Sequence, residues 1–316
     1  MFCTLYQNRM NQEITAMPIR VMSDTSEVVP YQNPRIPIFI GGTRVSNSVK
    51  DRMLCHWHED MEMLLVTDGV LTYSVNGEKY RLKKDEGVVV NSRQLHYGYS
   101  VDTKGADYLC VLCSPSLLSG SKEIYDDILR PFFEKGADCY LIGTENDSDL
   151  RIAQMIRLMH DAGKNGMVRS VELSIIGMTH LVIAELLNRN DSSSGLNLNA
   201  SESEIKSQKD MVAFVSSHYG EKITLEQIAE AGNVCRSSCC KLFKKYQGST
   251  PIEYLNDFRI KMSMNQLKHT DRSITEIAFL CGFRHSSYYT EMFRKSTGVT
   301  PGQFRKDLAA SPEEVI

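Results

Sequence analysis

ITEIAFLCGFRHSSYYTEMFRKSTGVTPGQFR, residues 274–305, repeats in altered form an earlier stretch, ITLEQIAEAGNVCRSSCCKLFKKYQGSTPIEYL, residues 223–255. Ile228-Ala229 aligns with Ile277-Ala278 at an offset of 49 residues, whereas the Gly-x-Thr-Pro ends align at 50. The slip of one residue falls in a turn, so each copy predicts a short helix, a tight turn and a second helix. Two such units in succession predict an all-α domain with tandem helix–turn–helix motifs.

The starts of the expected helices carry their own signals. Thr224-x-x-Gln227 and Ser273-x-x-Glu276 are capping boxes, in which the two side chains satisfy each other's unpaired backbone N–H groups. The segment between the motifs, residues 251–269, begins with a proline and repeats apolar positions close to helical spacing. We therefore expect one continuous helix to join the two motifs.

The second helix of each copy would carry polar and basic residues on its outer face. A solvated basic face is the ordinary explanation of such a run, but two copies of the same unit favour insertion into DNA grooves. Because Glu291 stands where the first copy has Lys241, the first motif should supply more base discrimination and phosphate attraction. The candidate DNA-binding residues are Arg236, Ser237, Ser238, Cys240, Lys241, Lys244, Ser286, Ser287, Tyr288, Glu291 and Arg294.

Charge and composition agree with a nucleic-acid partner. Residues 206–316 hold 16 Lys and Arg against 12 Asp and Glu, whereas residues 1–205 hold 20 against 27. An acidic N-terminal part and a basic C-terminal part are typical of a regulator that binds nucleic acid through one of its domains. The 42% hydrophobic content excludes a disordered chain. No run approaches the roughly 20 apolar residues of a membrane-spanning helix, and no signal peptide is evident. We expect a cytoplasmic protein without a membrane partner.

The front of the chain predicts strands followed by helices. Residues 34–113 alternate short apolar runs with turns, and the Asn-Gly of residues 75–78 predicts a type I′ hairpin in a small barrel or sandwich. Apolar stripes at helical spacing occur within 152–159 and 169–189. These helices either cover the barrel or pair with a second subunit. The expected parts are a mobile arm (1–30), a barrel (31–145), a helical segment (146–190), a linker (191–205) and a DNA-binding domain (206–310).

Residues 206–306 resemble the DNA-binding domain of the AraC/XylS transcriptional regulators. The chain departs from that pattern at Cys235, where a serine cap is usual, at His285, where Asp or Asn is usual, and at Glu291, often an arginine. The resemblance implies a ligand-responsive activator that works with RNA polymerase. It is carried by Ile228-Ala229, Phe243-Lys244-Lys245, Gly248-Ser249-Thr250-Pro251, Ile274-Thr275-Glu276-Ile277-Ala278, Gly282-Phe283, Ser287-Tyr288-Tyr289, Phe293-Arg294-Lys295 and Gly298-Val299-Thr300-Pro301.

The stretch HWHEDME, residues 56–62, raises the question of a metal. On a strand His56 and His58 would project to one face, Glu62 lies four residues further on, and His96 comes from a later strand. These four residues could hold a metal ion, which leaves open a metal-dependent cupin enzyme or a metal sensor. The favoured hypothesis makes them a metal-free ligand site that binds hydroxyls or a charged group, as a sugar-like ligand requires, or in part a hydrogen-bonded pair in the core.

The same residues resemble the first motif of cupin barrels, His56-x-His58-x3-Glu62-x6-Gly69, with His96 in place of the second motif's histidine. Lys50 replaces the leading glycine of enzymatic cupins, and Asn91-Ser92-Arg93 replaces their Pro-x-Gly turn. These departures resemble the sensor barrels of the regulator family. They imply a site without catalytic residues, resident metal or cofactor.

The sequence thus predicts an α+β protein of two domains. A cupin-like β-barrel with a helical hairpin comes first, and an all-α tandem helix–turn–helix domain follows. The expected function is sequence-specific DNA binding by a regulator that is not an enzyme. Its expected partners are double-stranded DNA, a small-molecule effector, RNA polymerase and a second copy of the chain.

Overall fold

The computed structural model describes residues 29, 31, 33, 35–46, 53–102, 104–164, 169–189, 195–196 and 201–310. The chain forms two compact units, one with the strands and helices between residues 38 and 196 and one with the helices between 202 and 310. This division confirms the predicted two-domain α+β class. The arm expected at residues 1–30 lies outside the described residues except for Val29.

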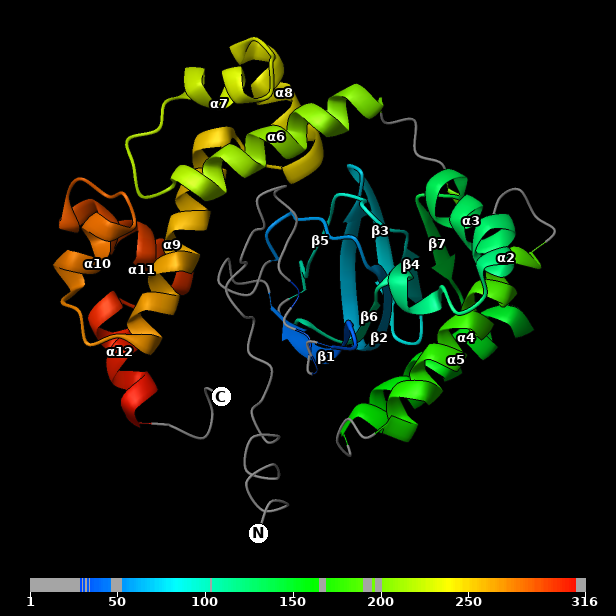
Figure 1. Ribbon diagram of the computed structural model, residues 1–316. Coiled ribbons are helices and arrows are strands. Elements are labelled where there is room, and N and C mark those ends of the chain that lie inside the picture. The colour runs from blue at the N-terminus through cyan, green and yellow to red at the C-terminus, as the bar shows by residue number, and fades with distance from the viewer. Residues whose placement is uncertain are drawn as a thin grey trace. The chain divides into compact units, whose positions relative to one another are not determined.

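An antiparallel sheet is the framework of the first unit (Figure 1). Its long central strand β2 pairs with β6 and β4 along its first half and with β3 and β5 along its second half. One strand therefore joins the two parts of a cupin-like sheet domain. The strands are β1 (Ile38–Val45), β2 (Met61–Val75), β3 (Glu78–Lys83), β4 (Gly87–Val90), β5 (His96–Tyr99), β6 (Ala106–Cys113), β7 (Cys139–Ile142) and β8 (Gly195–Leu196).

A bulge in the middle of β2 changes which way its side chains face. The pairing with β6 shifts between Val66 and Asp68, which inserts one residue and reverses the inward–outward alternation beyond it. Gly69 follows with a φ of 76°, and a Cβ there would lie 2.2 Å from the Gly105 carbonyl oxygen. Only glycine fits this bend. The end of β2 forms the predicted type I′ hairpin, because Asn76 and the next residue both have positive φ.

Two helices cover one face of this sheet (Figure 1). Met61, Met63 and Leu65 of β2 face them, and the predicted stripe of α4 supplies the buried side chains of Ile152 and Ile156. Glu62 and Leu64 therefore point to the opposite face of the sheet, away from the helices. The helices are η2 (Pro115–Leu118), α2 (Lys122–Ile124), η3 (Tyr125–Leu129), α3 (Arg130–Lys135), α4 (Asp147–Lys164) and α5 (Arg169–Leu187).

Two findings differ from the sequence expectations. Gly195–Leu196, within the predicted linker, pairs with β7 and so belongs to the sheet. Residues 170–187 of α5 are long and apolar enough to cross a membrane by length and composition, with a mean hydropathy of 1.5. Ile175, Val182 and Ile183 of this segment are buried in the core between sheet and helices. Burial in that core accounts for their hydrophobicity.

Helices alone build the second unit. The predicted capping boxes are present at Thr224 and Ser273, and Thr250 begins the joining helix with a third one. Gly248 and Gly298 end the second helix of each motif in the left-handed conformation, with φ of 68° and 83°. The helices are α6 (Glu202–His218), α7 (Leu225–Ala231), α8 (Arg236–Gln247), α9 (Pro251–His269), α10 (Ile274–Leu280), α11 (Ser286–Thr297) and α12 (Pro301–Ala310).

Candidate functional site

The second helix of each motif presents one polar face and buries the other. Cys239 and Phe243 of α8 are buried, as are Tyr289 and Phe293 of α11, so these side chains fix each helix against its own motif. The predicted DNA-binding residues lie away from that face. Arg236, Ser237, Lys241, Lys244, Ser287, Tyr288, Glu291 and Arg294 are exposed, and Ser238, Cys240 and Ser286 are partly exposed.

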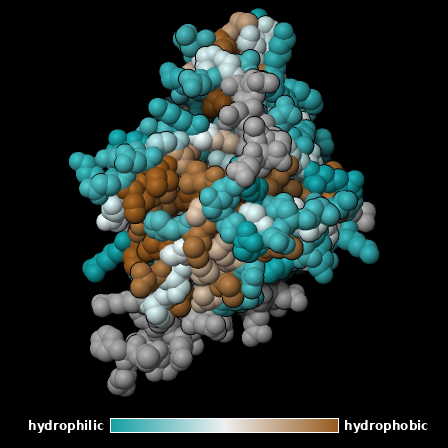
Figure 2. Space-filling view, turned by 90° about the vertical axis from the view of Figure 1, so that its right-hand side faces the viewer, coloured by the Kyte–Doolittle hydropathy of each residue, from teal (hydrophilic) through white to brown (hydrophobic). Residues whose placement is uncertain are grey.

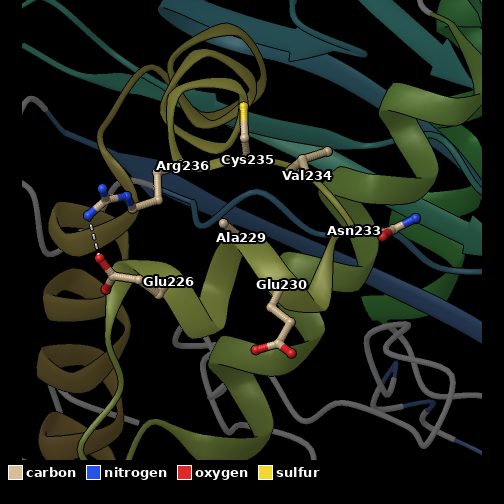
Figure 3. Close-up of a pocket in the computed structure, with 7 residues that line it drawn as sticks. All are labelled: Glu226, Ala229, Glu230, Asn233, Val234, Cys235 and Arg236. Carbon is tan, nitrogen blue, oxygen red and sulfur yellow. Dashed lines mark hydrogen bonds and ion pairs between the residues drawn. The ribbon is translucent and has the colours of Figure 1, made fainter.

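Not all of the basic residues on α8 are equally available. The Arg236 guanidinium reaches back to the Glu226 carboxylate on α7, at 2.6 Å (Figure 3). The Lys245 ammonium is held by Glu204 of α6 at 2.6 Å and lies over the ring of Tyr246. Lys241, in contrast, forms no ion pair within the part of the chain that the structure describes. A DNA phosphate would have to compete for Arg236 but not for Lys241.

The start of α8 has a feature that the sequence reasoning did not identify as functional. Cys235 occupies the N-cap position without a side-chain cap to the helix, which agrees with its departure from the family pattern. Its exposed Sγ lies 3.1 Å from the Ser237 hydroxyl and 3.3 Å from that of Ser238. Hydrogen bonds from these two serines and from their backbone lower the pKa of the Cys235 thiol to about 6. A thiolate at neutral pH thus stands at the start of a predicted recognition helix (Figure 3).

A cluster of three histidines and one glutamate lies in the sheet unit. His56 and His96 form a backbone bridge, exchanging N–H···O hydrogen bonds of 3.1 and 2.9 Å, so their side chains leave the sheet on the same face. Their ring centroids lie 4.3 Å apart, and the His58 ring lies 4.8 Å from that of His96. The structure therefore brings all four predicted residues of the ligand site together.

Glu62 is the centre of this cluster. Its Oε2 lies 3.3 Å from His58 Nε2 and 3.1 Å from His96 Nε2, and its Oε1 accepts a 2.7 Å hydrogen bond from the Tyr73 hydroxyl. Burial by itself would raise the pKa of the Glu62 carboxyl, but attraction and hydrogen bonding from His96 and His58 hold it well below its usual range. Burial and the neighbouring Glu62 raise the pKa of Tyr73 well above its usual value.

Tyr73 and Asp60 are neighbours of the cluster that the sequence reasoning missed. Tyr73 is fully buried on β2, eleven residues after Glu62, and an odd spacing on a regular strand would place it on the other face. The bulge between them restores a common face. The buried carboxylate of Asp60 accepts hydrogen bonds from the Tyr31 hydroxyl at 3.0 and 2.9 Å. The sequence could have indicated Asp60, because this residue lies two positions after His58.

Comparison with known proteins covers both units. Residues 48–175 match the family model of the AraC-like ligand binding domain, and residues 228–307 match that of a helix-turn-helix domain. The uncharacterized HTH-type transcriptional regulator YdeC of Bacillus subtilis is 28% identical over 285 residues, covering 89% of this chain and 95% of that protein. The HTH-type transcriptional activator RhaS of Enterobacter sp. strain 638 is 24% identical, covering 81% and 88%. A crystal structure of ToxT from Vibrio cholerae O395 has 15% identity and a TM-score of 0.42, covering 85% and 97%.

Proposed function

Because this chain belongs to the AraC family of transcriptional regulators, we propose that α8 and α11 bind an operator and that a small molecule at the histidine–glutamate cluster changes this binding. The observation that carries the proposal is the presence, in one chain, of the AraC-like ligand-binding domain and two helix–turn–helix motifs with polar outer helices. The cluster is defined as His56, His58, Glu62 and His96.

The joining helix supports binding by both motifs of one chain. The 19 residues of α9 extend about 28 Å at 1.5 Å per residue. With the width of the motifs at each end, α8 and α11 would reach successive major-groove segments, which lie about 34 Å apart. The footprint of one chain would then cover about two helical turns. Protection should be strongest over the half read by α8, because Lys241 stands there and Glu291 stands on α11.

The cluster supports effector binding because its polar atoms converge at a buried place. His58, Glu62 and His96 are each no more than 5% exposed, whereas His56 is partly exposed. Buried polar groups that converge on one point are typical of sites that recognise a small polar ligand. We propose that the effector is bound and not turned over. The relatives named as activators favour activation. We propose that this activation acts on RNA polymerase in the cytoplasm.

A second copy of the chain is the partner we propose for α5. Leu173, Gly177, Leu181 and Ala184 form one stripe on this helix, and all four are exposed. Leu173 is 72% and Leu181 58% exposed, and Figure 2 shows a broad hydrophobic area on the side of the molecule that carries α4 and α5. An apolar area of this kind marks an interaction site in a soluble protein. The glycine and alanine would let two such helices approach closely.

Footprinting of DNA upstream of the protein's own gene, with and without candidate metabolites, tests the regulatory proposal. We expect protection over about two turns per chain and a change of affinity with one metabolite class. His58→Ala should remove that change and keep the affinity for DNA in its absence. Protection of a single groove segment, insensitive to Ser287→Ala and Tyr288→Ala, would show that α11 does not take part.

Light scattering of the purified chain tests the dimer. Leu181→Glu should convert a dimer to a monomer, because it buries a charge in the stripe. Ile252→Glu, which changes an exposed residue of α9, is the matched control and should leave the mass unchanged. A wild-type protein that is monomeric at all accessible concentrations would refute this part.

A further inference from the structure

Two histidines of the cluster have their protonation pattern set by the backbone. His58 Nδ1 lies 3.0 Å from the Asp60 carbonyl oxygen, and His96 Nδ1 lies 2.8 Å from the Gln94 carbonyl oxygen. A carbonyl oxygen only accepts hydrogen bonds, so each Nδ1 must carry the ring hydrogen. In a neutral imidazole the other nitrogen, Nε2, is then an unprotonated lone pair.

Both of these lone pairs face one carboxylate oxygen. Nε2 of His58 and Nε2 of His96 lie 3.3 and 3.1 Å from Glu62 Oε2, and all three side chains are buried. Lone pairs and a carboxylate oxygen repel each other at these distances unless a positive charge lies between them. A proton on Nε2 supplies this charge at His58, whose Nε2 lies within hydrogen-bonding distance of Glu62 Oε2. One divalent ion between the three side chains would supply it to both nitrogens and the carboxylate at once.

The separations suit a metal ion instead. Ligand atoms that lie 2.0–2.1 Å from a tetrahedral zinc ion are about 3.4 Å from one another. The separations of 3.3 and 3.1 Å from Glu62 Oε2 are close to this value, and the ligand atoms of the cluster all lie within 4.8 Å of one another. Small movements of the side chains would therefore bring four donors onto one ion.

The surroundings of the cluster resemble those that orient metal ligands. Histidine ligands of metals almost always donate their other N–H to a carbonyl or carboxylate, as His58 and His96 do here. The Tyr73 hydroxyl donates to Glu62 Oε1 and leaves Oε2 directed at the histidines. His56 is partly exposed, which provides a route for an ion from solvent.

We propose that His56, His58, Glu62 and His96 bind one divalent transition-metal ion, and that this ion is part of what the sensor domain recognises. Three imidazoles and one carboxylate favour ions such as Zn²⁺ and Ni²⁺ over Mg²⁺ and Ca²⁺. The sequence alone favoured a metal-free site. The regulatory role of the ion rests on the proposed function, but its binding does not.

Metal analysis and calorimetry of the full chain test the site. The protein is stripped with a chelator, titrated with Zn²⁺, Ni²⁺ or Mg²⁺, desalted and assayed for bound metal. Exposed Cys235 could also bind zinc, so the measurement is repeated in Cys235→Ser. We expect one tightly bound Zn²⁺ or Ni²⁺ per chain in both proteins and none of Mg²⁺.

Variants locate the ion. Glu62→Gln and His96→Ala should lose the tight site, and Tyr73→Phe should weaken affinity about 10- to 100-fold because it removes only an orienting hydrogen bond. His180→Ala, a partly buried histidine on α5, is the matched control and should bind metal normally. Circular dichroism checks the fold. If Glu62→Gln does not fold, the metal stoichiometry of the wild-type chain and the metal affinity of Tyr73→Phe test the site instead.

Two outcomes would overturn the proposal: a folded wild-type chain that takes up less than about a tenth of an equivalent, or stoichiometric binding that persists in folded Glu62→Gln and His96→Ala. Operator binding is measured on the same preparations. A chain that binds its operator but no ion refutes the metal site alone. A chain that binds the ion but no DNA refutes the regulatory proposal alone.

Discussion

Lys241 provides the sharpest test of how the first motif holds DNA. It is exposed on α8 and forms no ion pair with any residue that the structure describes, so none of these residues neutralises its charge. Lys245 lies four residues further on, but its ammonium is 2.6 Å from the Glu204 carboxylate and 4.9 Å from the Tyr246 ring centroid. The two lysines therefore form a matched pair, one available to DNA and one committed within the protein.

Lys241→Ala should weaken operator binding by about 1–3 kcal/mol, which corresponds to roughly 5- to 150-fold. A contact with a phosphate would also lower the slope of log K against log salt by about 0.9, because one fewer counterion is released. A contact with a base edge would instead relax the preference at one operator position. The salt series thus separates the two kinds of contact.

Fluorescence anisotropy with the footprinted operator, between 50 and 200 mM salt, measures both quantities. Lys245→Ala should bind the operator with nearly wild-type affinity and slope. Equal losses of operator affinity in Lys241→Ala and Lys245→Ala would show that only the net charge of the protein determines its binding to DNA. Unchanged affinity in Lys241→Ala would refute its assignment to the DNA surface.

Three further predictions follow from individual contacts. Asp149→Ala leaves Arg189, whose side chain is 9% exposed, without its carboxylate partner, so urea unfolding should show a loss of about 3–5 kcal/mol, and a loss below about 1 kcal/mol would refute the role of this pair. Thr250→Ala removes the cap of α9 and should cost about 1 kcal/mol in the same assay, with no loss if solvent satisfies the helix start equally well. Because the thiolate is the nucleophile, the alkylation rate of Cys235 should rise with pH through a midpoint near pH 6, whereas buried Cys239 should not react. Peptide mass spectrometry measures the alkylation of both cysteines. A midpoint near the ordinary pKa of a thiol would contradict the lowered pKa of Cys235.

The DNA-binding unit could be predicted in detail because its signals are local. The capping boxes at Thr224 and Ser273, the glycine ends of α8 and α11, and the limits of α9 at residues 251–269 all agree with the structure. Each signal acts within one turn of a helix, so the sequence around it suffices. What the sequence did not predict there is charge pairing. Lys245 finds its partner Glu204 41 residues away, and only packing of α6 against α8 brings them together.

The sheet unit was less predictable because its contacts are distant in the chain. Gly195–Leu196 has the composition of a linker yet pairs with β7, since an edge strand needs hydrogen-bonding partners more than a particular side chain. The inner face of α5 followed from its periodicity, but its outer stripe is known to be exposed only because the structure shows which face the sheet covers.

By itself the sequence determined the class of the protein, the tandem motifs and the identity of His56, His58, Glu62 and His96 as a set. Only the tertiary structure decided what that set can do. The bridge between His56 and His96 joins segments 40 residues apart, and the bulge in β2 turns Tyr73 onto the face of Glu62. The backbone carbonyls then orient two rings so that their lone pairs meet one carboxylate. Such an arrangement depends on strand register and ring orientation, which residue spacing does not encode.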